Sequence, residues 1–183
     1  EKTAKDHDVV VCCGYQFSGV NEAAEKYPDD DFILVDSTPV DSSGNVIVMK
    51  NVYSMCFKEQ ESGFCAGMAA AMQTKTGKVA VVNGVAYPSN VDYQYGFMCG
   101  VKDVNETENR DVECIEIPAY AGKDVSGRNV GGNYTGNFND RAAAREISRA
   151  LIREGCDVIF AAAGGAGRGV FDAAKNARNV YVI

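Results

Sequence analysis

One stretch restricts the fold of this chain more than any other, namely residues 157–183, DVIFAAAGGAGRGVFDAAKNARNVYVI. An apolar run at 158–163 is typical of a strand buried on both faces of a sheet, and it stops abruptly at Gly164 and Gly165. A helical period follows, and a second apolar run begins at Val180. This order predicts a strand, a glycine turn, a helix and a second strand.

The glycine turn is also the first candidate for a binding site. Glycines at the carboxyl end of a parallel strand let the backbone approach a ligand closely. The helix that follows points free N–H groups into the same crevice. We therefore expect Gly164 and Gly165 to form part of a site for a bound molecule.

The same alternation of strand and helix patterns extends over the rest of the chain. Strands are predicted at 9–13, 32–35, 46–49, 78–82 and 112–120, and helices at 20–27, 54–73, 91–104 and 141–154. Residues 121–132 read as a polar, glycine-rich insertion without periodicity. Repeated βαβ units predict an α/β fold of doubly wound parallel sheets with helices on both faces.

Two of the predicted helices carry further signals. The helix at 54–73 has a face of small residues that would let a neighbouring backbone come close, namely Gly63, Ala66, Gly67, Ala69 and Ala70. The helix at 141–154 follows Asn139 and Asp140, either of which can cap it.

The strongest candidate boundary is the short polar segment TKTG at 74–77. Gly77 is placed to stop the preceding helix, and a fresh apolar run begins at Lys78. We therefore expect two domains, at 1–74 and 78–183, joined by a hinge at 75–77.

Charge and hydropathy exclude several classes of protein. The net charge of −7 and the pI near 4.8 argue against a nucleic-acid partner, because we find no segment with the clustered Lys and Arg that phosphates require. We also find no basic amphipathic helix for a membrane face. The longest apolar stretch, 64–72, is about half of the ~20 residues that cross a bilayer.

The seven cysteines and the single histidine limit metal chemistry. Cys12, Cys13, Cys65, Cys114 and Cys156 lie in or beside apolar segments, and we expect most cysteines to be small buried hydrophobes. There is no C-x-x-C pair, so we expect no metal site. The odd count disfavours a disulfide framework but leaves one bridge open.

Cofactor and catalytic motifs are lacking. The run GGAGRG at 164–169 is not the G-x-G-x-x-G fingerprint, because Val170 stands where the third glycine belongs, and no P-loop is present. His7 lies in a polar leader, and the carboxylates at 29–31 lie in a predicted turn. We expect no catalytic residues, no cofactor and therefore no enzyme.

Two side chains stand out at predicted strand ends and turns. Phe138 lies between Asn137 and Asn139. Its ring would either stack on a flat ligand, which the two amides would orient, or pack under the loop. Asp36 ends an apolar strand, where it would accept hydrogen bonds from a ligand or else cap the following turn.

Three runs of sequence point to a known family. They are KEQESGFCAGMAAAMQTKTGKVAVVNG at 58–84, YQYGFMCGVK at 93–102, and YTGNFNDRAAAREISRALIREGCDVIFAAAGGAGRGVFDAAKN at 134–176. In this order they closely resemble the basic membrane protein, or PnrA-like, family of nucleoside-binding lipoproteins of ABC transporters. The resemblance implies a type I periplasmic-binding-protein fold, with two α/β lobes that close on a ligand.

The resemblance also implies roles for particular residues. Gly14, Tyr15 and Asp36 would line the cleft from the first lobe. Phe138 would stack on the base beside Asn137, and Gly164 and Gly165 would form the backbone floor. Tyr93 and Phe97 would lie near the cleft in the second lobe.

Some family features have no counterpart in the chain. The opening strand with its S-F-N-type motif, the V-D-x-D-Q-type segment expected after Ile183, and the lipobox cysteine are not found. The resemblance therefore implies a chain truncated at both ends, with a partial first lobe at 1–74, a hinge at 75–77 and a second lobe at 78–183.

The expected function is that of an extracytoplasmic, cell-surface or periplasmic binding protein. It would capture a nucleoside, a purine nucleoside in particular, and present it to ABC permease subunits. Its membrane attachment would come only from an N-terminal lipid anchor outside this chain. One alternative is the ligand-sensing core of a regulator with the same fold. The other is a Rossmann-type enzyme, but this chain lacks the glycine fingerprint of such enzymes.

Overall fold

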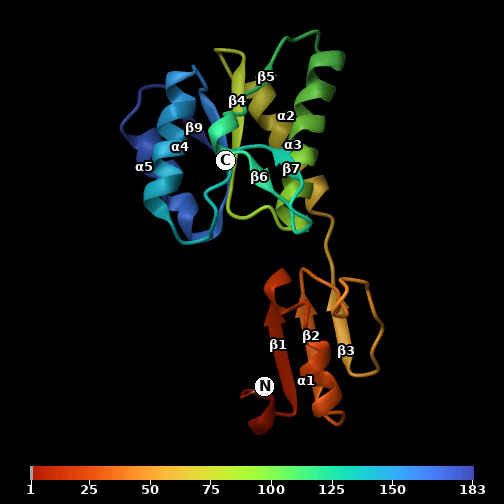
Figure 1. Ribbon diagram of the computed structural model, residues 1–183. Coiled ribbons are helices and arrows are strands. Elements are labelled where there is room, and N and C mark those ends of the chain that lie inside the picture. The colour runs from red at the N-terminus through yellow and green to blue at the C-terminus, as the bar shows by residue number, and fades with distance from the viewer. Residues whose placement is uncertain (1) are drawn as a thin grey trace. The chain divides into compact units, whose positions relative to one another are not determined.

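The computed structural model describes residues 2–183, and they fall into two compact units. The first unit ends at Phe57, and the second comprises Lys58–Ile183 (Figure 1). Each unit contains its own parallel β-sheet and its own hydrophobic core. The predicted α/β fold with parallel sheets is therefore confirmed.

The first unit is a three-stranded parallel sheet in the order β1, β2, β3. The strands are β1 (Val9–Cys13), β2 (Asp31–Val35) and β3 (Val52–Met55). The 3₁₀ turn η1 (Ala4–Asp6) precedes β1, and the turn η2 (Tyr15–Phe17) and helix α1 (Asn21–Lys26) connect β1 to β2. The core lies on the face that α1 covers and contains Ala4, Cys12, Val20, Ala24, Phe32 and Leu34.

The third strand of this unit differs from the prediction. Residues 46–49 form no strand; Val46 makes only an isolated antiparallel bridge with Val40. The turn between them is held by Asp41, whose Oδ1 accepts hydrogen bonds from the N–H groups of Ser43 and Asn45 at 2.8 and 2.9 Å. The strand that extends the sheet is β3, so the predicted helix start at 54 is also wrong.

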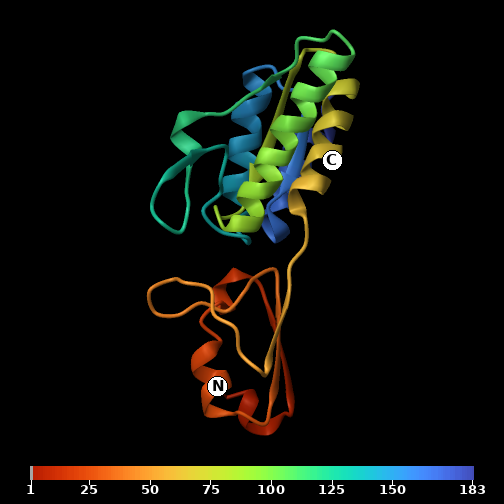
Figure 2. The same cartoon turned by 90° about the vertical axis from the view of Figure 1, so that its right-hand side faces the viewer.

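The second unit has a four-stranded parallel sheet in the order β5, β4, β8, β9. The strands are β4 (Lys78–Asn83), β5 (Glu113–Cys114), β8 (Val158–Ala162) and β9 (Tyr181–Val182). Helices α2 (Glu59–Gln73) and α3 (Pro88–Thr107) cover one face, and α4 (Arg141–Arg153) and α5 (Arg168–Lys175) cover the other (Figures 1 and 2). The doubly wound arrangement is thus present in this unit.

The glycines of the small-residue face predicted for α2 pack against α3, whereas Ala69, which was predicted on the same face, is exposed. A Cβ atom at Gly63 would meet the backbone of Tyr93, and one at Gly67 would meet the backbone of Phe97. Helix α3 contributes Gly96 and Gly100, which lie against the α2 backbone in the same way. The two helices approach so closely because neither has side chains at these positions.

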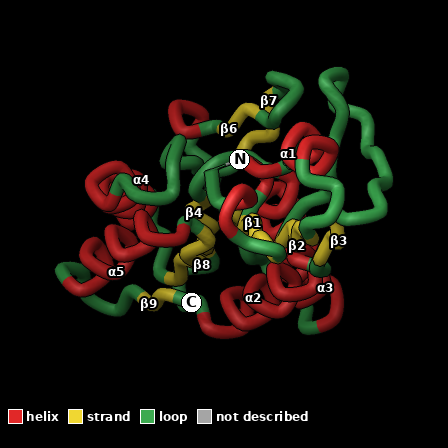
Figure 3. Tube along the Cα trace, turned by 90° about the horizontal axis from the view of Figure 1, so that it is seen from below, coloured by secondary structure: helices red, strands yellow, loops and turns green. Residues whose placement is uncertain are grey.

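The segment between β5 and α4 is more ordered than its composition suggests. The strand predicted at 112–120 is only two residues long. Beyond it, the carbonyl oxygen of Ile115 and the N–H of Ile117 bond to the side chain of Asn133, and the 3₁₀ turn η3 (Pro118–Tyr120) follows. The supposed insertion contains an antiparallel pair, β6 (Gly122–Lys123) and β7 (Asn129–Gly131), visible in Figure 3. The carboxylate of Asp124 closes its tip by accepting hydrogen bonds from the N–H groups of Ser126 and Arg128.

The division between the compact units lies before α2, whereas the sequence pattern predicts a boundary after it. Residues 74–77 belong to the second unit, and Thr74, Lys75 and Thr76 donate hydrogen bonds to the carboxylate of Asp157. The hinge at 75–77 stays a prediction.

The cysteines are less buried than expected. Cys12 and Cys156 are buried, but Cys13, Cys56 and Cys65 are exposed. All seven are free thiols, so the bridge that the sequence left open is not formed. In the described part of the chain, no helix combines the length and the apolar character that a membrane span requires.

Candidate functional site

The carboxyl edge of the second sheet is built around the ends of β4 and β8. The strand β4 runs into Gly84, whose N–H donates to the carbonyl oxygen of Ala162 at the end of β8, at 3.3 Å. The segment after β7 returns along β4: the N–H groups of Thr135 and Gly136 donate to the carbonyl oxygens of Asn83 and Gly84, at 2.9 and 3.0 Å. These bonds carry the chain to Phe138 at the edge of the sheet.

Phe138 rests on glycine backbone. A Cβ atom at Gly84 would overlap with the Cδ1 and Cε1 atoms of the ring, and one at Gly164 would lie 3.4 Å from Cδ1. The carbonyl oxygen of Phe138 accepts a hydrogen bond from the N–H of Ala166, at 2.8 Å. The side chain is half-buried, so part of the ring stays accessible at the carboxyl edge.

The other residues predicted for this edge surround Phe138. Gly164 begins the 3₁₀ turn η4 (Gly164–Gly167) with a φ of 54°, a left-handed value that suits glycine. A Cβ atom at Gly165 would lie 3.1 Å from the carbonyl oxygen of Phe138. Both glycines are exposed, so their backbone is accessible beside the ring.

The side chain of Asn137 stabilises this turn. Its Oδ1 accepts hydrogen bonds from the N–H groups of Asn139 and Asp140, at 2.8 and 2.6 Å. Asp140 in turn caps α4 by accepting from the N–H of Ala143 at 2.9 Å, so the helix cap expected at 139 or 140 is Asp140. Because Oδ1 of Asn137 already accepts these two hydrogen bonds, its Nδ2 is the side-chain group that could donate to a ligand.

Tyr87 is a second aromatic residue at the same edge. It precedes α3, and its ring centroid lies 6.1 Å from that of Phe138, with the planes tilted by 39°. Tyr87 follows the strand predicted at 78–82 but is not among the site residues predicted from the sequence. An aromatic residue just after a parallel strand is the signal that would have found it.

Phe97 lies in the interior of the unit, and Tyr93 on the same helix is half-buried. The Phe97 side chain is 0% exposed and stacks on Phe160 of β8, with centroids 5.9 Å apart and planes 8° apart. Tyr93 meets the same ring edge-on, also at 5.9 Å. The structure therefore makes Phe97 a core residue and does not bring its ring to the edge.

Beneath the edge lies a set of buried amides. Asn133 accepts from the N–H of Ile117 and donates to the carbonyl oxygens of Val81 and Ile115, at 2.9 to 3.1 Å, so it ties the returning segment to β4. Asn90 donates to Asn83 Oδ1 at 3.3 Å. These bonds fix the backbone on which Phe138 rests.

The candidates in the first unit gather at the carboxyl edge of its own sheet. Gly14 follows β1 with a φ of 101°, and its N–H donates to the carbonyl oxygen of Val35 at 2.8 Å. Tyr15 begins η2 directly after it. Asp36 follows β2, is exposed, and has a φ of 59°, a value that aspartate tolerates better than most residues. The three residues are thus neighbours at two adjacent strand ends.

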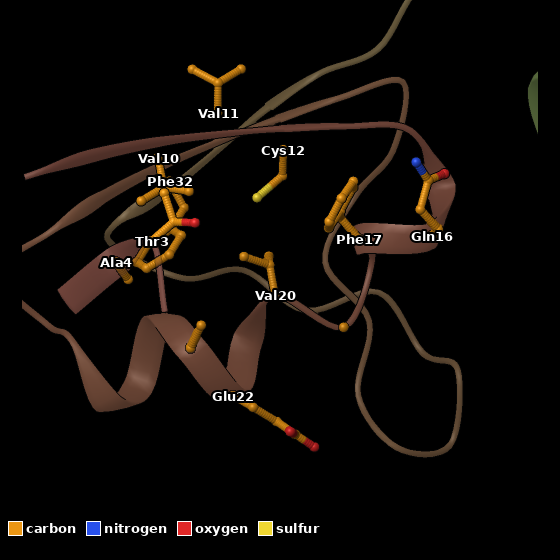
Figure 4. A pocket seen from close by; sticks show the side chains of 12 residues that line it. Thr3, Ala4, Val10, Val11, Cys12, Gln16, Phe17, Val20, Glu22 and Phe32 are labelled. Carbon is orange, nitrogen blue, oxygen red and sulfur yellow. The ribbon is translucent and has the colours of Figure 1, made fainter. Parts of the chain in front are cut away.

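A cavity of about 410 Å³ lies elsewhere in the first unit, between β1, α1 and the two 3₁₀ turns. Figure 4 shows Cys12, Phe17 and Val20 pointing toward it, whereas Val11 points away. Its lining is mainly apolar and includes none of the predicted site residues. We assign it no chemistry.

The described residues offer little for catalysis or metal binding. Within 2–183, no three side chains of His, Cys, Asp or Glu are grouped so that they could hold a metal ion. His7 is exposed, and its Nδ1 lies 3.0 Å from the carbonyl oxygen of Thr3.

The fold defines the class of protein. Parallel α/β sheets with polar and aromatic groups at their carboxyl edges are typical of the type I periplasmic-binding-protein fold. A solved ABC transporter solute-binding protein from Aeropyrum pernix K1 matches the chain with a TM-score of 0.76 and 24% identity, over 94% of this chain and 43% of that one.

The family follows from the sequence. The model of the family described as ABC transporter substrate-binding protein PnrA-like matches residues 2–116 and 120–183. The chain belongs to this family, and the resemblance inferred from its motifs is confirmed.

Two curated relatives have similar sequences. The "CD4+ T-cell-stimulating antigen" of Listeria monocytogenes is 31% identical over 97% of this chain, and the "ABC transporter nucleoside-binding protein BmpA" of Lactococcus lactis is 32% identical over 84%. The matches cover 44% and 36% of these two proteins, so the chain spans less than half the length of either relative.

Proposed function

We propose that the chain is part of an extracytoplasmic nucleoside-binding protein that delivers its ligand to the permease of an ABC transporter. Membership of a substrate-binding family supports transport, and the name of the Lactococcus lactis relative supports a nucleoside. The preference for a purine, the lipid anchor and the permease partner rest on the family resemblance alone. No catalytic step is part of this function.

The observation that carries the proposal is the position of Phe138. Its ring is backed by the glycines at 84 and 164, and part of it is accessible at the carboxyl edge of a parallel sheet, where ligands of such folds bind. A nucleobase is a flat ring that would stack on this surface, and Tyr87 would border it. Asn137 Nδ2 and the N–H groups of the glycine turn would donate to the base.

The first unit would supply complementary groups. The carboxylate of Asp36 would accept hydrogen bonds from ribose hydroxyls, and Gly14 and Tyr15 lie at the neighbouring strand end. The proposal includes closure of the two lobes on the ligand, as the family resemblance implies. A ligand-sensing regulator would use the same fold, but the family match favours transport.

The test is isothermal calorimetry of the full-length protein with a panel of purine and pyrimidine nucleosides. We expect binding by at least one purine nucleoside and a loss of affinity of about fivefold or more in Phe138→Ala, because stacking is worth about 1 kcal/mol. Tyr95→Ala removes an exposed aromatic side chain of α3 and serves as the control. If no nucleoside binds, the assignment of ligand is wrong.

A further inference from the structure

The charge of the chain is unevenly distributed. Residues 141–183 contain seven cationic and four acidic side chains, a net charge of +3, whereas residues 1–140 contain eleven cationic and 21 acidic side chains, a net charge of −10. Six of the eight arginines lie in the last 43 residues. The basic part of the sequence includes α4 and α5, which lie side by side over one face of the second sheet (Figures 1 and 3).

Helix α4 carries four of these arginines in one row. Arg141, Arg145, Arg149 and Arg153 are each four residues apart and all exposed, so each lies about one turn beyond the last. The row is about 18 Å long. The opposite side of the helix is buried, with Ala144, Ile147 and Leu151 in the core. The prediction from the sequence rests on the apolar side of this helix only and therefore includes no basic amphipathic helix. The structure shows that α4 is one.

Helix α5 lies beside α4 and adds the cationic side chains of Arg168 and Lys175. The guanidinium of Arg141 binds the carboxylate of Asp172 through two hydrogen bonds, and Gly169 lets the helices approach, because a Cβ there would meet the backbone of α4. The hydrogen bonds from Arg141 lower the pKa of Asp172, and the charges of Arg141, Arg145 and Lys175 act in the same direction. The carboxylate therefore has three cationic neighbours.

Only part of this positive charge is neutralised within the chain. Arg141 pairs with Asp172 and Arg149 with Glu146. In the described residues, Arg145, Arg153 and Arg168 have no carboxylate within ion-pair distance. On α5, Phe171 lies three residues after Arg168, on neighbouring positions of the helix surface, and is 55% exposed.

We propose that the outer face of α4 and α5 binds an anionic phospholipid surface. Guanidinium groups fit phosphate oxygens through paired hydrogen bonds, and an exposed aromatic ring among cations is typical of segments that lie in a membrane interface. The row extends along a whole helix, and a depression of about 290 Å³ between Arg141, Arg145 and Asp172 is open to solvent. Such a face fits an extended anionic surface better than a small ligand.

The net negative charge of the whole chain does not prevent this contact. At physiological salt the Debye length is about 8 Å, so acidic groups farther from the membrane are screened, whereas cations at the contact are not. The charge distribution would orient the protein with this face toward the lipid. This surface is independent of the proposed nucleoside site, since none of the residues assigned to that site lies on α4 or α5.

The test is co-sedimentation of the 183-residue chain with lipid vesicles at low salt. We expect binding to vesicles of phosphatidylglycerol and phosphatidylcholine, none to phosphatidylcholine alone, and release by added salt. Replacing Arg145 and Arg153 by Gln should weaken binding about fivefold for each arginine. The matched control changes Lys50 and Lys123 to Gln, which removes the same charge from exposed sites outside α4 and α5.

Phe171→Ser should weaken binding without altering its salt dependence, because it removes an apolar contact and no charge. The absence of phosphatidylglycerol-dependent binding, or an equal loss in the lysine control, would overturn the proposal. Binding of poly-glutamate without binding of vesicles would also overturn it and would assign the face to an acidic protein partner.

Discussion

Gly84 lies directly beneath the ring of Phe138, where even a single methyl group would overlap with two ring carbons. The N–H of Gly136, two residues before Phe138, donates to the carbonyl oxygen of Gly84, so the same glycine holds the backbone that carries the ring. The position of the ring therefore depends on a residue with no side chain of its own.

Gly84→Ala should displace Phe138 and weaken nucleoside binding by about as much as Phe138→Ala, because stacking needs the ring in a fixed place. Calorimetry measures the affinity, and the thermal unfolding midpoint reports any general damage to the fold. Gly19→Ala is the matched control, since a Cβ at Gly19 would have no atom within 4 Å. Unchanged affinity in Gly84→Ala would show that the ring is not the anchor.

The contact between α2 and α3 should be sensitive to one added methyl group. A Cβ at Gly67 would meet the backbone of Phe97, which cannot move aside as a flexible side chain can. We expect Gly67→Ala to lower the free energy of unfolding by about 1–3 kcal/mol, the usual cost of overpacking. Urea denaturation measures the change. Ser62→Ala, at an exposed position of the same helix, should change it by less than about 0.5 kcal/mol.

Asp157 should make the second unit sensitive to acid. Burial raises the pKa of Asp157, but hydrogen bonds from the Thr74 hydroxyl and from the N–H groups of Lys75 and Thr76, at 2.7 and 3.1 Å, hold it below its ordinary value. Because the folded-state pKa is lowered, the stabilisation is present above the unfolded value of about 3.9 and is lost as the pH falls through the folded value.

Asp157→Asn should therefore lower the free energy of unfolding by about 2 kcal/mol at neutral pH, since hydrogen bonds to a charged group are lost. The difference from the unchanged protein should stay constant between about pH 7 and about pH 5 and shrink as the pH falls further toward about 3. Urea midpoints measured over this range check both statements. A difference that does not vary with pH would mean that the charge of Asp157 has no part in holding residues 74–77.

The local patterns of the sequence predict the central elements well. β4 and β8 are continuous apolar runs and α4 has a clear helical period, so each is recognisable without its neighbours. β3 is different, because VYSM has no strong period and becomes a strand by pairing with β2. The local pattern alone favours a strand at 46–49, because it contains no information on the pairing with β2.

The surroundings of an aromatic side chain depend on long-range packing, which the local sequence does not contain. Phe138 is recognisable from the local sequence, because a large apolar residue is unexpected in a polar turn. Phe97 and Tyr95 belong to the same helix pattern, and only the packing against Phe160 shows that one ring is fully buried and the other exposed. Tyr87 is recognisable as an aromatic residue after a strand, but its position beside Phe138 comes from the fold, because the two residues are distant in sequence.

The thiols should divide into two groups by reactivity, because the thiolate is the reactive form. Burial raises the pKa of Cys156 to about 12, whereas Cys13 and Cys65 are exposed. At a pH of about 8, we expect Ellman's reagent to modify Cys13 and Cys65 quickly and Cys156 only after unfolding in urea. Mass spectrometry of the peptides identifies the modified residues. Modification of Cys156 at the rate of Cys13 in the folded protein would contradict its position in the core between α4 and the sheet.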